Sequence, residues 1–175
     1  MDIDKRRSLM NSFFLSQYSY CPLIWMFMNH KTNLKINRLQ ERSLRILYKD
    51  DTSTFEQLLH KDNSVTVHTR NIRLVATERY KAYHGISPDI ICDIFPKAEI
   101  KWNLRNQKDF ETPRINTVWG SVSLRYLGPQ VWNIVPINIK ASPNLKKFKI
   151  DIKKWEPKYC PSRLCKTYMT GIGFI

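Results

Sequence analysis

The stretch that most constrains the fold is residues 33–49, where two classes of residue repeat with the period of an α-helix. Apolar side chains are expected to share one face: Ile36, Leu39, Ile46 and Leu47. Cations at steps of three and four residues fall on another face: Lys35, Arg38, Arg42, Arg45 and Lys49. Because only Glu41 dilutes this charge, the stretch predicts a helix with one packed side and one positive side.

Capping and turn signals predict more helices in the first half of the chain. A helix over residues 4–18 is expected to end or bend at Cys21-Pro22, because the residue before a proline disfavours helical backbone. Ser53 with Glu56 forms a capping-box pattern that opens a short helix. A longer helix is expected over residues 65–84 with Gly85 behind it, and Ser87-Pro88 opens another short helix.

The second half of the chain has a different sequence pattern. Residues 110–118 and 121–127 alternate and carry β-branched side chains around Trp119-Gly120, which predicts a small β-hairpin. Gly128-Pro129 is expected to start a short helix, and Ser142-Pro143 the last one, with its apolar side at Leu145, Phe148, Ile152 and Trp155. The prediction is a mainly α-helical α+β fold, with a helical domain at 1–95 and a hairpin, a C-terminal helix and a Cys-containing tail at 96–175.

The charge balance points to a polyanionic partner. Lys and Arg number 29 against 15 Asp and Glu, a formal net charge of +14. Nucleic acid is therefore the first candidate partner and an anionic membrane surface the second. The most apolar stretch, residues 20–28, contains Pro22 and is too short to span a bilayer. We expect no membrane segment and an intracellular protein, cytoplasmic or nuclear, and the sequence leaves its oligomeric state open.

The five-cation face at 35–49 is the strongest candidate site, because such a face can follow a phosphate backbone. The alternative is an ordinary solvated surface. Arg70 and Arg73 form a second basic face on the next long helix, and Arg105 lies beside Trp102 in a loop that could stack on a base. His68 falls with apolar neighbours, so we expect it to be hydrogen-bonded and partly buried.

The tetrad Tyr48-Lys49-Asp50-Asp51 resembles the aromatic-x-Asp-Asp motif with which polymerases hold two metal ions. That chemistry needs a tight strand-turn-strand and a third carboxylate nearby. Here the tetrad ends an amphipathic helix and precedes a capped one, so we interpret it as a helix end and loop. A metal-dependent nuclease is accordingly the most distant alternative.

The four cysteines do not form a disulfide framework. Cys160 and Cys165 are weak metal candidates, because a structural zinc site needs four ligands and no second close pair lies near them. Free thiols and no zinc are expected.

Several blocks, in order along nearly the whole chain, carry a resemblance to a known family. They are 9–14 (LMNSFF), 16–18 (SQY), 20–26 (YCPLIWM), 36–42 (INRLQER), 55–59 (FEQLL), 61–65 (KDNSV) with His68, 103–106 (NLRN), 126–129 (YLGP) with Trp132, 165–168 (CKTY) and 173–175 (GFI). This series resembles the C-terminal end of jockey-like non-LTR (LINE-type) retrotransposon reverse transcriptases, which are RNA-directed DNA polymerases.

The resemblance places the chain after the catalytic palm, in the thumb and the region beyond it. It implies a thumb-like helical bundle that contacts template-primer duplex or element RNA. It also implies no catalytic aspartates and no polymerase activity of the chain alone, since Mg²⁺ would be held in the missing palm. Two departures from the family pattern weaken a metal or paired-imidazole role: Ser162 stands where members often have Cys, and Thr69 where they often have His.

Sequence alone therefore predicts a nucleic-acid-binding fragment of a retroelement polymerase and leaves the choice between RNA and DNA open. Two alternatives stay open beside it. The chain is a truncated, non-functional relic, or it is a protein-interaction module that docks on the polymerase palm through residues 20–27.

Overall fold

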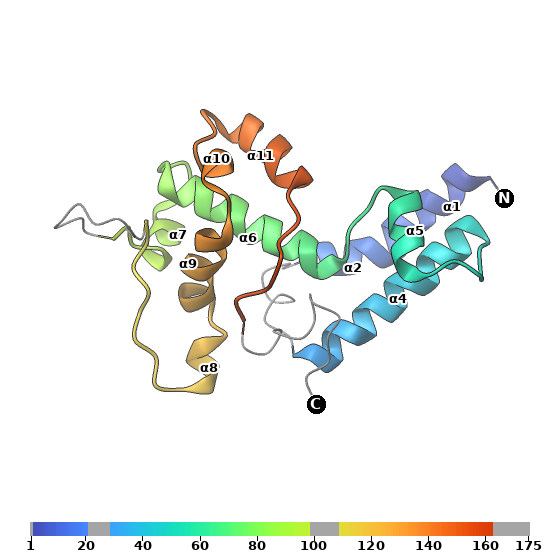
Figure 1. The fold of residues 1–175 in the computed structure, drawn as a ribbon, viewed down its shortest axis with the longest axis horizontal. Helices are drawn as coiled ribbons and strands as arrows, with labels where there is room; N and C mark the ends of the chain where they lie inside the picture. The colour runs from blue at the N-terminus through green and yellow to red at the C-terminus, as the bar shows by residue number, and fades with distance from the viewer. Residues whose placement is uncertain (1, 21–28, 99–108, 163–175) are drawn as a thin grey trace. The chain divides into compact units, whose positions relative to one another are not determined.

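The computed structural model describes residues 2–20, 29–98 and 109–162, and that part of the chain is mainly helical (Figure 1). Contacts group into two compact units, Met1–Asn71 and Ile72–Ile175, with the boundary inside helix α6 (Val67–Tyr83). The predicted domain boundary after residue 95 stays a prediction. None of the described helices is both long and apolar enough to cross a membrane.

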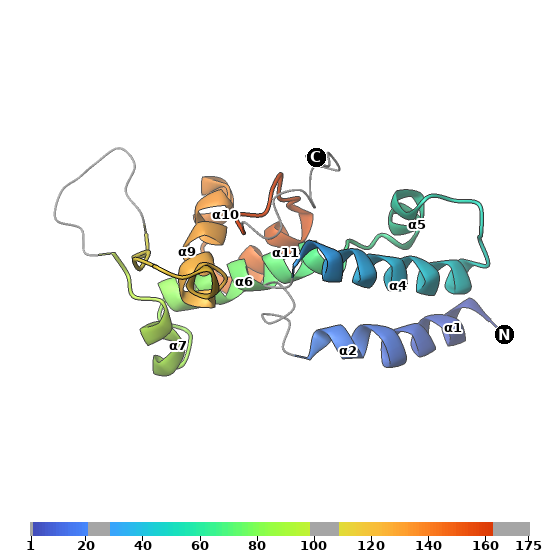
Figure 2. The same cartoon turned by 90° about the horizontal axis from the view of Figure 1, so that it is seen from below.

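The first unit is built around an antiparallel helix pair. Helix α1 (Ile3–Leu9), the π-helical turn η1 (Met10–Leu15) and α2 (Ser16–Ser19) follow one another without a break, and α4 (His30–Tyr48) runs back beside them (Figure 2). Both helices predicted in this region are confirmed. Helix α4 starts three residues early because the Asn29 side chain accepts from the Thr32 N–H at 2.9 Å.

The packed side of α4 differs from the predicted one. Ile36 and Leu47 are buried, whereas Leu39 and Ile46 are exposed. The buried stripe is completed by Asn33, Gln40 and Leu44. Gln40 is buried at little cost because its amide is hydrogen-bonded: it donates to the Val65 carbonyl at 3.0 Å and accepts from the Val67 N–H at 3.2 Å. This shifts the packed side so that Ile46 faces solvent.

Helix α5 (Phe55–Asp62) packs on α4 through Leu44, Leu47 and Leu58, each at most 1% exposed. Its capping box is Thr54 with Gln57, one residue later than predicted. Ser53 is not free to cap because both its N–H and its hydroxyl donate to Asp50, at 3.0 and 2.8 Å. The predicted helix is confirmed and the predicted cap is wrong.

The second unit has an aromatic core between α6, α9 (Leu124–Ile134) and α11 (Leu145–Lys154). Tyr80 stacks on Phe148 with ring centroids 4.2 Å apart, and Trp132 stacks on Phe148 at 6.2 Å. The Tyr80 hydroxyl donates to the Ser142 carbonyl at 2.7 Å, which fixes the turn between α10 (Ile137–Lys140) and α11. The predicted last helix and its apolar side are confirmed, with Asn144 rather than Ser142 as its cap.

The predicted β-hairpin is wrong. In the described part of the chain no strand forms, and β pairing is limited to one isolated bridge between Lys97 and Phe110. Residues 110–117 are extended without a partner strand, and the expected turn at Trp119 is a helical turn, α8 (Val118–Ser121). Leu127 and Val131, four residues apart, are both buried, so the second expected strand is instead the amphipathic start of α9.

Helix α9 contains Gly128 and Pro129, which were expected to begin it. It begins earlier because the Ser123 hydroxyl caps the Tyr126 N–H at 3.3 Å. Glycine is required at 128 by a close approach: a Cβ there would lie 2.9 Å from a ring carbon of Phe95 and 3.4 Å from the Arg79 Nε.

Helix α7 (Asp89–Ile94) confirms the helix predicted after Ser87-Pro88, but Pro88 rather than Ser87 precedes its first residue. Gly85 has φ of 67°, the left-handed backbone expected of the residue that ends α6.

Candidate nucleic-acid interface

The outer side of α4 carries a row of exposed cations, which we call the basic face: Lys31, Lys35, Arg38, Arg42 and Lys49. At 100° per residue the four cations within α4 lie within about 60° of one another and roughly opposite the buried stripe, and Lys49 follows at the C-terminal end of the helix. The ion pairs of the described residues leave all five unpaired. The basic face spans about 27 Å along the helix, at 1.5 Å per residue.

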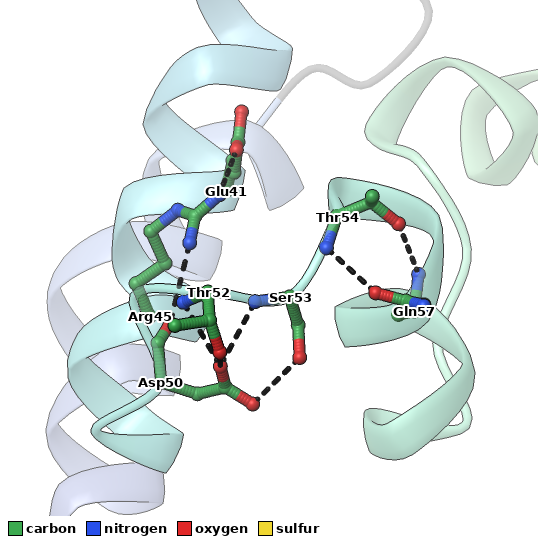
Figure 3. A network of polar contacts seen from close by, with 7 residues as sticks. All are labelled: Glu41, Arg45, Asp50, Thr52, Ser53, Thr54 and Gln57. Carbon is green, nitrogen blue, oxygen red and sulfur yellow. Dashed lines mark hydrogen bonds and ion pairs between the residues drawn. The ribbon is translucent and has the colours of Figure 1, made fainter.

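Arg45 was predicted to belong to this row but is engaged within the first unit. Its Nη2 lies 2.7 Å from Glu41 Oε1, and its Nη1 donates to the Asp50 carbonyl at 3.4 Å (Figure 3). The pair cancels the charge of Arg45 and accounts for the one carboxylate on the helix. The i,i+4 spacing of Glu41 and Arg45 is visible in the sequence and indicates this pairing.

Lys31 is a member of the basic face that sequence reasoning missed. It precedes the predicted start of the helix at residue 33, so it was not placed on any face. The signal that could have found it is Asn29, since an Asn before a helical pattern is a typical N-cap and adds one turn to the helix.

The second predicted basic face is partly buried. The Arg73 Nε donates to the Trp155 carbonyl at 2.8 Å, which ties the end of α11 to α6. Burial lowers the pKa of both Arg70 and Arg73. These two residues are therefore less available to a phosphate than the basic face of α4. Arg105 and Trp102 lie outside the described residues.

The Tyr48–Asp51 tetrad forms a helix end. Lys49 has left-handed backbone, with φ of 52°, and closes α4. Asp50 then caps the following turn (Figure 3). Its carboxylate accepts from the Ser53 N–H and hydroxyl, from the Thr52 N–H and from the Lys61 ammonium at 3.1 Å. Tyr48 joins a second network, donating to Asp62 at 2.8 Å while Arg7 donates to its hydroxyl at 2.8 Å.

These contacts predict a stability that depends on Asp50 ionisation. The Ser53 backbone N–H, the Ser53 hydroxyl and Lys61 hold the pKa of Asp50 well below its usual range. A carboxyl whose folded-state pKa is depressed stabilises the fold above its unfolded pKa, and this contribution is lost as pH falls through the folded-state pKa. Asp50→Asn should therefore be less stable than the unmodified chain at about pH 7, by a margin that shrinks towards about pH 2.

Urea unfolding followed by far-ultraviolet circular dichroism measures this margin at each pH. Asp51→Asn is the matched control, because Asp51 is exposed and these contacts are made by Asp50 alone. A margin for Asp50→Asn that stays constant with pH, or one equalled by Asp51→Asn, would show that the Asp50 turn does not stabilise the fold.

The remaining candidates are placed as follows. His68 is 2% exposed and Thr69 is 9% exposed, at the start of α6. Cys160 is buried, and Cys165 lies outside the described residues. Within the described ranges, no group of three or more His, Cys, Asp or Glu side chains could hold a metal ion. The expectation that zinc is not bound stays a prediction.

Comparisons with protein-family models, with curated proteins and with solved structures found no match to this chain. The functional argument therefore depends on the surfaces of the chain itself, and first on the basic face of α4.

Proposed function

We propose that the chain binds nucleic acid through the basic face of α4, as expected of a thumb-side fragment of a retrotransposon reverse transcriptase without its palm. The observation that carries the proposal is the row of exposed, unpaired cations opposite the buried stripe of α4. A helix that packs on one side only can lie along a phosphate backbone with the other.

The dimensions of the basic face suit a duplex. One strand carries a phosphate about every 3.4 Å along the duplex axis but winds around that axis, so a helix about 27 Å long lies beside only a few phosphates of each strand. Flexible Lys and Arg side chains need only a few of these to gain affinity through counterion release. Contacts of this kind are insensitive to sequence, which predicts binding to RNA–DNA hybrid, RNA and DNA alike.

The test is fluorescence anisotropy of a labelled RNA–DNA hybrid with the full chain, at about 50 mM and about 200 mM salt. Replacing Lys35, Arg38 and Arg42 together by alanine removes three phosphate contacts. The triple variant should bind roughly tenfold more weakly at the higher salt. The slope of log K against log salt should become shallower by about 2 to 3.

A dispersed triple variant controls for net charge. Lys5, Lys146 and Lys158 are exposed and lie outside α4, so replacing them by alanine lowers the net charge equally and should cost much less affinity. Equal losses in the two triple variants would mean that overall charge, rather than the basic face, attracts nucleic acid. Weak binding that neither triple variant changes would contradict the proposal and favour the alternative that the chain is a non-functional relic.

The alternative of docking on a polymerase palm rests on residues 20–27, of which only Tyr20 is described, at 79% exposure. No observation in the described residues favours it over the basic face, and it stays a prediction of the sequence.

A further inference from the structure

The most exposed aromatic side chain of the described residues is Trp119 in α8, at 84% exposure beside Val118 at 71%. Figure 1 shows α8 beyond the extended segment that follows Phe110. Most Trp side chains are largely buried, because the indole ring carries a large apolar surface. An exposed Trp beside an exposed Val therefore marks a surface suited to a partner.

The turn that carries Trp119 is held by its own hydrogen bonds. The Thr117 hydroxyl accepts from the Gly120 N–H at 3.0 Å, and the Ser121 hydroxyl donates to the Val118 carbonyl at 2.6 Å. The Ser123 hydroxyl donates to the Gly120 carbonyl at 2.8 Å. Because these hydrogen bonds already fix the backbone, the turn would lose little conformational entropy when a ligand covers Trp119.

The charge around Trp119 favours an anionic ligand. Between Glu111 and Lys140 the only charged residues are Arg114 and Arg125. Arg114 and Arg125 are exposed. Arg114 adjoins Ile115, whose side chain lies against Gly120, and Arg125 is in the first turn of α9, whose cap Ser123 bonds to Gly120.

We propose that Trp119 is a stacking platform for an unpaired base of single-stranded nucleic acid, with Arg114 and Arg125 contacting the flanking phosphates. An indole ring stacks on the π-face of any base, and cations beside it suit the backbone. A paired base in a duplex has no free face, so Trp119 selects single strands. This deepens the proposed function, on which it rests: the basic face binds duplex and single strands by charge, and Trp119 adds a preference for unpaired bases.

The test compares a labelled deoxythymidine single strand with a duplex of the same length, by anisotropy against the full chain. Trp119→Ala should weaken single-strand binding roughly tenfold and leave duplex binding unchanged. Trp119→Phe should keep most of the affinity, since phenylalanine also stacks. Ile137→Ala is the matched control because Ile137 is a second, 83% exposed apolar side chain in the same unit, and its loss should change neither ligand.

Single-strand affinity that Trp119→Ala does not change would overturn the proposal, as would an equal loss for both ligands. Self-association in analytical ultracentrifugation that Trp119→Ala abolishes, with single-strand affinity retained, would also overturn it and assign Trp119 to a protein interface. Failure of the proposed function looks different, because the alanine variants of α4 would then leave the binding of both ligands unchanged.

Discussion

Trp132→Ala is expected to lower the free energy of unfolding by about 4 kcal/mol, the largest loss we predict for a single substitution. Trp132 is 1% exposed and stacks between Tyr83 and Phe148, with Phe110 edge-on at 5.9 Å. Its indole Nε1 donates to Asp109 at 2.5 Å. Truncation removes the apolar contacts of all three rings at once and leaves a cavity that α6, α9 and α11 cannot fill without moving.

Urea unfolding followed by far-ultraviolet circular dichroism measures the loss, and Trp119→Ala provides the matched control. The same indole is removed in both variants, but Trp119 is 84% exposed and its loss should change stability by no more than about 0.5 kcal/mol. Trp132→Phe keeps most of the ring stacking and loses the hydrogen bond to Asp109, so it should cost about 1 to 2 kcal/mol. Equal stabilities of the two alanine variants would contradict this core.

The helices were predictable from sequence because their signals are local. Spacing placed α4 and α11 within about three residues, the usual error at helix ends. The side chains that cap them are also close in sequence: Asn29 bonds to Thr32, and Asn144 bonds to Lys147. A helix is predicted well when the groups that start it lie within one turn of its first residue.

The predicted hairpin was wrong because the alternating pattern of its second strand also fits a helix. Residues 121–127 alternate as a strand does, but Ser123 as a cap, with Leu127 and Val131 four residues apart, also fits a helix. The packing of α9 against Phe95 and Arg79 at Gly128 favours the helix. That packing joins residues far apart in sequence, which spacing alone does not show.

The positive charge of the candidate site was predictable from sequence, but the set of cations that form it was less so. Lys35, Arg38 and Arg42 lie on the face where the period placed them, whereas Lys49 follows the end of α4 in left-handed backbone. Arg45 is neutralised by Glu41 four residues earlier, a pairing that the spacing indicates but does not by itself establish. Trp119 was assigned to a turn, because exposure depends on which elements fail to cover a residue, and that is a property of the whole fold.

Arg79→Met is expected to raise the free energy of unfolding by about 2 kcal/mol, an unusual gain for the loss of a charged residue. Arg79 is 0% exposed, and its guanidinium carbon lies 3.9 Å from the ring centroid of Phe95 and 3.6 Å from that of Phe110. None of its nitrogens forms a hydrogen bond within the described structure. The charge is therefore held between two rings, without a carboxylate.

The sizes of three energetic contributions decide whether Arg79→Met stabilises or destabilises the fold. Burial lowers the pKa of Arg79 to about 9, and a difference of this size from the ordinary value of arginine corresponds to about 5 kcal/mol against the charged form. Two desolvated cation–π contacts offset about 4 kcal/mol of this cost. Methionine keeps the length of the side chain and adds sulfur–aromatic contacts of about 1 kcal/mol without any buried charge. The sum favours methionine by about 2 kcal/mol.

Urea midpoints of the unmodified chain, Arg79→Met and Arg79→Ala separate charge from packing. Alanine removes the charge but also the stem that fills the space between Phe95 and Phe110, so it should be about 2 to 4 kcal/mol less stable than methionine. If Arg79→Met is less stable than the unmodified chain, the guanidinium gains more from its surroundings than two rings supply. A buried cation kept at a net cost would instead indicate that Arg79 serves a role other than stability, since replacing an unpaired buried charge by an apolar side chain of similar size ordinarily stabilises a fold.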